Sequence, residues 1–195
     1  MYTTYNTYPG HYYLNPPTNN PNAYTCPYCA NTPMCNLDFS NQYIPFTELK
    51  DHGPEPFVVN INEATKQNDT YRTALWTGRH LQVTLMSLKV GEDIGLEVHP
   101  NLDQFIRIEQ GQGIVQMGDL KDRLDFQERV YDEFAFVIPA GKWHNLINTG
   151  NEPLKLYSIY APPQHPHGAV HVTKSDAQAA EEHRGYYYQE GYRVP

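Results

Sequence analysis

The chain has few cysteines and few basic residues, and both shortages exclude whole classes of protein. Its 195 residues include only 3 cysteines, which lie close together at Cys26, Cys29 and Cys35. Cysteines placed in this way cannot form a disulfide framework for the rest of the chain. Lysine and arginine total 14 against 22 aspartate and glutamate residues, which gives a formal net charge of −8. Because such an acidic chain repels nucleic-acid phosphates and anionic lipids, we expect neither as a partner.

Long apolar runs are also missing. No stretch of the sequence is long and apolar enough to span a bilayer, and the N-terminus lacks the basic-then-apolar pattern of a secretion signal. We therefore expect a cytoplasmic protein with no membrane partner. The length suits one domain with its own hydrophobic core and is short for two.

The two ends of the chain differ in composition from the middle. Residues 1–45 contain many tyrosines, prolines and asparagines and have no apolar period of 2 or 3.6, so we expect an irregular N-terminal segment. Residues 173–195 combine a helical pattern, with Thr173 or Ser175 placed to cap it, and a tyrosine-rich tail. The tyrosine-rich flanks resemble bacterial spore-coat proteins in composition, which makes the spore coat an alternative location.

The middle of the chain, residues 46–172, has the pattern of an all-β domain. A short helix is predicted over residues 62–67, and residues 81–88 then alternate apolar and polar side chains as a half-buried antiparallel strand does. Short strands separated by turn formers predict a sandwich or barrel. The predicted strands are Phe57–Val59, Tyr71–Trp76, Leu81–Leu88, Gln104–Glu109, Ile114–Met117, Phe134–Ile138, Trp143–Ile147 and Leu154–Tyr160.

Four side chains that can bind a metal lie on or beside these strands. Glu97 and His99 are two residues apart, so on a strand they point to the same side. Gln104 opens the next strand, and His144 lies at the start of a later one. Two imidazoles, one carboxylate and one amide oxygen suit Zn, Fe, Mn, Co or Ni better than Ca or Cu(I). With one anionic ligand, a divalent ion keeps net positive charge and can activate water or polarise a carbonyl.

The stretch around His144 resembles the second motif of the cupin superfamily. That motif runs Pro-x-Gly-x-x-His-x-x-x-Asn, and Pro139, Gly141, His144 and Asn148 match it at every spacing. The motif begins with a glycine that precedes the proline by six positions, and Glu133 stands there instead.

The stretch around His99 resembles the first cupin motif in spacing but departs from it at two ligand positions. The motif has a glycine, five residues, His-x-His, three or four residues, a glutamate, six residues and a glycine, and Gly91, His99 and Gly111 match it. Glu97 replaces the first motif histidine, and Gln104 replaces the motif glutamate. The exchange keeps four possible ligands and a single negative charge.

The resemblance implies a single-domain cupin, which is an antiparallel jelly-roll β-barrel, with a divalent transition metal bound by Glu97, His99, Gln104 and His144. Phosphomannose isomerases, which are also cupins, are similar in using one glutamine, one glutamate and two histidines around zinc. The implied function is isomerase, lyase or oxygenase chemistry on a small-molecule substrate, a sugar or an organic acid. The implied assembly is a homodimer. The alternative is a non-catalytic cupin scaffold or binding protein, whose tyrosine-rich tails mediate assembly.

Two other patterns resemble functional motifs. Cys26-Pro-Tyr-Cys29 is similar to a glutaredoxin redox motif, but it lacks the preceding strand and following helix that this chemistry requires, which favours a flexible tail. His165, His167 and His171 form a second candidate metal cluster. The prolines around them favour instead a packed or solvated turn.

Overall fold

A computed structural model describes residues 47–189 of the chain, with side chains up to residue 182. The interpretations of residues 1–45, including those of the three cysteines, lie outside the described residues, as does the end of the tyrosine-rich C-terminal tail. By its contacts the chain divides into two units, Met1–Pro45 and Phe46–Pro195. The architecture below is that of the second unit.

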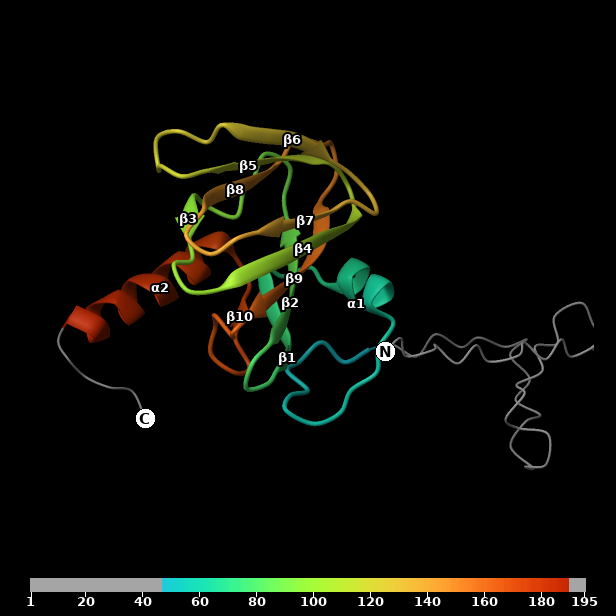
Figure 1. Cartoon of the computed structure of the whole chain (residues 1–195). Helices are drawn as coiled ribbons and strands as arrows, with labels where there is room; N and C mark the ends of the chain where they lie inside the picture. Colours follow the sequence, from blue (N-terminus) through green and yellow to red (C-terminus); the bar gives the residue numbers. More distant parts are fainter. Residues whose placement is uncertain (1–46, 190–195) are drawn as a thin grey trace, which may run out of the picture. The chain divides into compact units, whose positions relative to one another are not determined.

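The described part is built mostly from antiparallel strands, with one short helix before them and one longer helix after them (Figure 1). The elements, in chain order, are α1 (Ile61–Gln67), β1 (Arg72–Thr77), β2 (Gln82–Leu88), β3 (Glu97–Val98), β4 (Asp103–Gln110), β5 (Gly113–Gly118), β6 (Phe126–Val130), β7 (Ala135–Ile138), β8 (Trp143–Asn148), β9 (Leu154–Ala161), β10 (Val170–His171) and α2 (Lys174–Gln189).

The strands form two sheets that enclose the interior of a barrel. The larger sheet has six strands in the order β10-β1-β2-β9-β4-β7, and the smaller has four in the order β3-β8-β5-β6. Every pairing within them is antiparallel. In Figure 1 the smaller sheet lies above the larger one. This arrangement confirms the predicted all-β jelly-roll barrel.

Strand alternation decides which side chains enter the barrel. On β4, Ile106 and Ile108 point inward and are fully buried, whereas Arg107 between them is partly exposed. Burial of this apolar surface is the main force that holds the two sheets together. The interior cluster consists of Tyr71, Met86, Leu88, Ile94, Ile106, Ile108, Val115, Met117, Val130, Ile138, Leu146, Leu154, Leu156 and Ala177.

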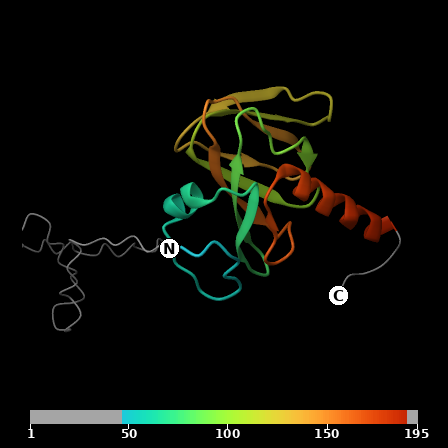
Figure 2. The same cartoon turned by 180° about the vertical axis from the view of Figure 1, so that it is seen from behind.

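A second apolar cluster covers the outer face of the larger sheet, where α1 lies (Figure 2). The Asn60 side chain caps α1 by accepting a hydrogen bond from the Glu63 N–H, as residues with short polar side chains do at helix starts. Ala64 of α1 packs there with Leu75 and Leu85, and partly buried apolar side chains, including those of Phe57 and Val59, surround them.

The predicted strand Phe57–Val59 is wrong. These residues pair with no other strand, although Phe57 and Val59 are packed and Val58 is 97% exposed. The run of three apolar residues thus serves packing alone. The β1 edge of the larger sheet, where a further strand could have paired, is taken by β10.

The other predicted strands are confirmed, and their ends differ from the prediction by about one residue. Three short strands, β3, β6 and β10, were not predicted. The strands β3 and β10 contain two residues each, too few for a period to be visible. The strand β6 has four exposed residues followed by buried Val130, so it lacks apolar alternation.

The helix α2 begins as predicted, with Thr173 as its cap. The Asp176 N–H donates to the Thr173 hydroxyl at 3.3 Å, and the Thr173 N–H donates to the Asp176 carboxylate at 2.8 Å, which is the reciprocal pattern of a capping box. Ala177 packs into the interior cluster, and Lys174 forms an ion pair with Asp93. Neither α2 nor any other helix within residues 47–189 is long and apolar enough to cross a membrane.

Candidate metal centre

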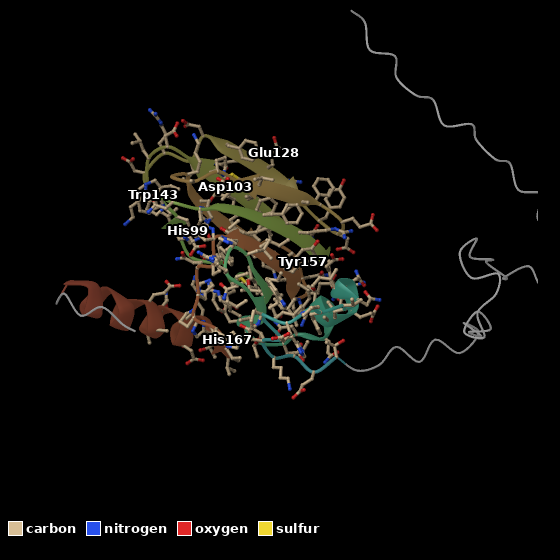
Figure 3. The ribbon with its side chains drawn as sticks, turned by 60° about the horizontal axis from the view of Figure 1, so that its bottom comes forward. His99, Asp103, Glu128, Trp143, Tyr157 and His167 are labelled. Carbon is tan, nitrogen blue, oxygen red and sulfur yellow. The ribbon has the colours of Figure 1, made fainter. Side chains whose placement is uncertain are left out.

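Backbone pairing brings the two sequence motifs together at one end of the smaller sheet. Glu97 on β3 lies directly opposite His144 on β8, and Val98 lies opposite Trp143. His99 follows β3 immediately and has a buried side chain. Figure 3 shows His99 and Trp143 close to each other at one end of the barrel, with Tyr157 farther along toward α1.

The turn before β8 ties the second motif to the first. Gly141 adopts φ +81°, a left-handed conformation that residues with a side chain rarely take. In this turn the Gly141 N–H donates to the backbone carbonyl of His99 at 2.8 Å. The glycine of the second motif therefore fixes the spacing between His99 and His144.

Three potential ligands converge in the barrel. One carboxylate oxygen of Glu97 lies 3.4 Å from His99 Nε2 and 3.3 Å from His144 Nε2, and the ligand atoms of all three residues lie within 4.8 Å of one another. His99 is 7% exposed and His144 is fully buried. Neither Nε2 atom has a hydrogen-bond partner in the described part of the chain. Buried polar atoms without partners are costly, so their convergence on one carboxylate is what a metal site requires.

The tautomer of His144 is set by the backbone. His144 Nδ1 lies 2.9 Å from the carbonyl oxygen of Lys142. Since a carbonyl can only accept a hydrogen bond, Nδ1 carries the proton and donates it. With a metal bound, the neutral ring would offer its Nε2 lone pair to the ion, the arrangement that outer partners impose on metal-binding histidines.

Glu97 is charged in this setting. Burial alone would raise the pKa of its carboxyl group, but His144 and His99 beside it and the positive charge of Arg72 hold the pKa well below its usual value. A carboxylate that stays ionised among imidazoles supplies the single negative charge expected from the sequence.

The fourth predicted ligand, Gln104, lies on the other sheet. It is buried on β4, its Nε2 donates to the Ser158 hydroxyl at 2.9 Å, and its Oε1 has no partner among residues 47–189. The structure thus clusters Glu97, His99 and His144 and points Gln104 into the same interior with its amide oxygen free.

Tyr160 and His165 line the same end of the interior; neither was among the four predicted ligands, although His165 was part of the second candidate metal cluster. The buried Tyr160 ring meets His99 edge-on at a centroid distance of 5.8 Å and His165 edge-on at 5.1 Å. Burial raises the pKa of Tyr160 to about 12, and burial together with Arg72 lowers the pKa of His165 to about 2. Both side chains are therefore uncharged at neutral pH. Alternation along β9, which buries Leu156, Ser158 and Tyr160, is the sequence pattern that identifies Tyr160.

The histidines after β9 do not form a second metal cluster. His165 is buried against Tyr160, whereas His167 is exposed and lies 3.0 Å from the Gly53 carbonyl oxygen. Within the described ranges, the group of Glu97, His99 and His144 is the one set of three or more such residues close enough to share an ion. His165 and His167 lie in the loop after β9, as the turn interpretation expects, whereas His171 lies on the short strand β10, which was not predicted.

Two other motif positions have structural roles. Glu133 adopts φ +70°, the left-handed conformation that explains why the motif has glycine at this position. The buried Asn148 side chain donates to the carbonyls of Leu88, Lys89 and Glu152 and accepts from the Gly150 N–H. Asn148 therefore joins the end of β2 to the loop between β8 and β9.

Comparisons with known proteins support the cupin fold. A family model described as a cupin domain, Cupin_2, matches residues 84–160. The uncharacterized protein YrkC of Bacillus subtilis (strain 168) is 75% identical over 134 residues, which covers 69% of this chain and 72% of that protein. The uncharacterized protein L612 of Acanthamoeba polyphaga mimivirus is 45% identical over 119 residues, 60% of this chain and 72% of that protein. The crystal structure of BH2720 from Bacillus halodurans has 69% identity and a TM-score of 0.66, and the match covers 67% of this chain and 98% of that one.

Proposed function

The chain belongs to the cupin superfamily, and we propose that it is a metal-dependent cupin that acts on a small sugar or organic acid. The reaction would be of the isomerase, lyase or oxygenase class. One observation carries the proposal: two buried imidazole nitrogens without hydrogen-bond partners in the described chain face the same Glu97 oxygen, at 3.4 and 3.3 Å.

The donor set decides which ions fit. Glu97, His99 and His144 would hold the metal, and the free Oε1 of Gln104 is the fourth candidate donor. Two nitrogens, one carboxylate and one neutral oxygen suit Zn, Fe, Mn, Co or Ni. A bound divalent ion supplies Lewis acidity, which polarises a substrate carbonyl or hydroxyl or activates water.

The protein's own residues would orient the substrate and exclude water. The Lys142 carbonyl holds the His144 ring in place, and the hydrogen bond from Gly141 to His99 fixes the distance between the two histidines. Tyr160 remains protonated and His165 remains neutral at neutral pH, so both are uncharged hydrogen-bonding groups beside the ligands. The apolar interior cluster behind them keeps bulk water out.

Elemental analysis tests the proposal. The full-length protein would be purified without added ions, then incubated separately with Zn, Fe, Mn, Co and Ni and desalted. We expect about one metal per chain in the wild type. His144→Ala and Glu97→Ala should lose it, since these changes remove a strong nitrogen donor and the one carboxylate of the cluster. His80→Ala, at an exposed histidine, is the matched control and should retain full metal. Circular dichroism verifies that each variant is folded.

A wild-type protein that stays metal-free with all five ions would contradict the proposal. It would leave the non-catalytic scaffold or binding protein as the better account. We also propose that the chain pairs as a homodimer, which sedimentation velocity tests. The proposed location is the cytoplasm, with the spore coat as the alternative, and fluorescence microscopy of a tagged chain tests it.

A further inference from the structure

A buried arginine lies inside the barrel. Arg72 on β1 is opposite Met86 on β2, and because Met86 belongs to the interior cluster, the Arg72 side chain points to the interior as well. Arg72 is 1% exposed. Arginine is almost never fully buried unless it is paired, because removing its charge from water is costly.

The pairing of Arg72 is incomplete. Its one ion pair within the described residues joins Nη1 to the Glu181 carboxylate on α2 at 3.4 Å, and the Glu181 side chain is 53% exposed. The Arg72 Nε has no hydrogen-bond partner in the part of the chain that the structure describes. A guanidinium presents five N–H donors in a planar fork that matches a carboxylate; among the described residues that of Arg72 donates to Glu181 and lies 5.6 Å from the centre of the Tyr71 ring.

The Arg72 side chain lies on the same interior face as the metal-centre residues. Arg72 is opposite Met86, and on the same face of β2 Gln82 is opposite Tyr160, whose ring meets His99 edge-on at 5.8 Å. Between these two rows the side chains of Ala74, Thr84 and Ser158 are small. The positive charge of Arg72 also contributes to the lowered pKa of Glu97 and of His165.

His165 Nε2, in the same region, is buried and makes no hydrogen bond to any residue described. Glu97 is the one carboxylate of the ligand cluster, and metal coordination would occupy it. With an ion bound, the one carboxylate left among the described residues for the buried charge of Arg72 would be the half-exposed Glu181.

We propose that Arg72 binds the carboxylate of the substrate, so that the substrate is a small carboxylic acid with a hydroxyl or carbonyl group beside the carboxylate for the metal. The inference rests on the proposed function, because the metal would take the second group. A divalent ion and Arg72 together with the carboxylates of Glu97 and Glu181 leave one excess positive charge, which one carboxylate neutralises and a doubly charged phosphate exceeds. Arg72, His99 and His144 are buried and the Glu97 side chain is only 19% exposed, so the ligand must be small.

Calorimetry on the full-length, metal-loaded protein tests this assignment with glycolate, its neutral counterpart glycolamide, and inorganic phosphate. We expect glycolate to bind about tenfold or more tightly than glycolamide, and more tightly than phosphate. Arg72→Gln should remove the preference for glycolate while elemental analysis still finds bound metal. Glu181→Gln should strengthen glycolate binding, because it removes the carboxylate that competes for Arg72. Arg107→Gln, at an arginine on the outer side of β4 that pairs with Glu109 at 3.2 Å, is the matched control and should change nothing.

The outcomes separate this inference from the proposed function. A metal-loaded protein that binds glycolate and glycolamide equally, or prefers phosphate, overturns the role of Arg72 and leaves the metal centre intact. A protein that takes up no metal but still prefers glycolate in an Arg72-dependent way overturns the metal centre and supports the role of Arg72. If Arg72→Gln does not fold, Glu181→Gln decides the matter, and unchanged or weaker glycolate binding in that variant contradicts the inference.

Discussion

The burial of His165 predicts a specific loss of stability in mild acid. This ring is 7% exposed, and burial together with Arg72 lowers its pKa to about 2. In the unfolded chain a histidine titrates near about 6.5. Between these values the unfolded chain binds one more proton than the folded protein, so the free energy of unfolding falls as the pH drops below about 6.5. One proton corresponds to about 1.4 kcal/mol per pH unit, which gives roughly 2 kcal/mol between pH 6.5 and pH 4.5.

The variant His165→Phe isolates this contribution. Phenylalanine keeps a ring against Tyr160, and no hydrogen bond is lost at Nε2, which has no partner among the described residues. The backbone of residue 165 keeps its bonds to the Gln82 side chain, at 2.9 and 3.0 Å. The half-buried His171, whose pKa is lowered by burial and by Arg72, is present in both proteins and cancels in the comparison.

The assay is denaturant unfolding of metal-free protein, in the presence of a chelator, at pH 7.5, 6.5, 5.5 and 4.5. The wild type should lose about 2 kcal/mol more than His165→Phe between pH 6.5 and pH 4.5. The lowered pKa of Glu97 also stabilises the fold, but this contribution belongs to lower pH. It is fully present above the ordinary carboxylate range and is lost as the pH falls through and below that range. Replacement of the exposed His80 by phenylalanine is the control and should follow the wild-type curve. Parallel curves for wild type and His165→Phe would refute the reasoning.

The remaining predictions concern the scaffold and the fourth ligand. Asn148→Ala should lower the free energy of unfolding by about 2–4 kcal/mol, measured by denaturant unfolding. It leaves three carbonyls and the Gly150 N–H without the hydrogen bonds that the Asn148 side chain makes. Glu133→Gly should raise the free energy of unfolding by about 0.5 kcal/mol in the same assay, since glycine relieves a left-handed conformation at some entropic cost. Gln104→Ala should weaken metal binding in a chelator competition without abolishing it, because a neutral amide oxygen is the weakest donor of the four. Deleting residues 1–45 should leave the melting temperature nearly unchanged, and conversion of a dimer into an unstable monomer would show that this segment is structural.

The sequence predicted the fold because strand periodicity and motif spacing point to the same architecture. Alternation along residues 81–88 and the turn formers between strands identified most of the barrel, and the cupin-like spacing indicated which strand ends meet. The strand that the sequence did not predict and the strand that it predicted wrongly each have a physical explanation. Alternation is absent from β6, whose residues are mostly exposed, and the packed segment Phe57–Val59 imitates a strand without pairing.

The candidate site was predictable only where its residues belong to the two motifs. Glu97 lies on β3 and His99 follows it directly, and His144 follows a recognisable turn, so their convergence could be expected. Arg72 lies at the start of the barrel sequence and His165 near its end. Pairing within the larger sheet and the loop after β9 bring the two residues into the interior of the barrel. No local pattern distinguishes Arg72 from a surface arginine before that pairing is known.

Anomalous X-ray diffraction at the absorption edge of the bound metal tests the central claim most directly. Crystals of the full-length protein loaded with zinc or cobalt should give one strong anomalous peak inside the barrel. The account predicts this peak about 2.0–2.3 Å from the Nε2 atoms of His99 and His144 and from a carboxylate oxygen of Glu97. A barrel without a peak there, or a peak held by other residues such as His167, would contradict the account.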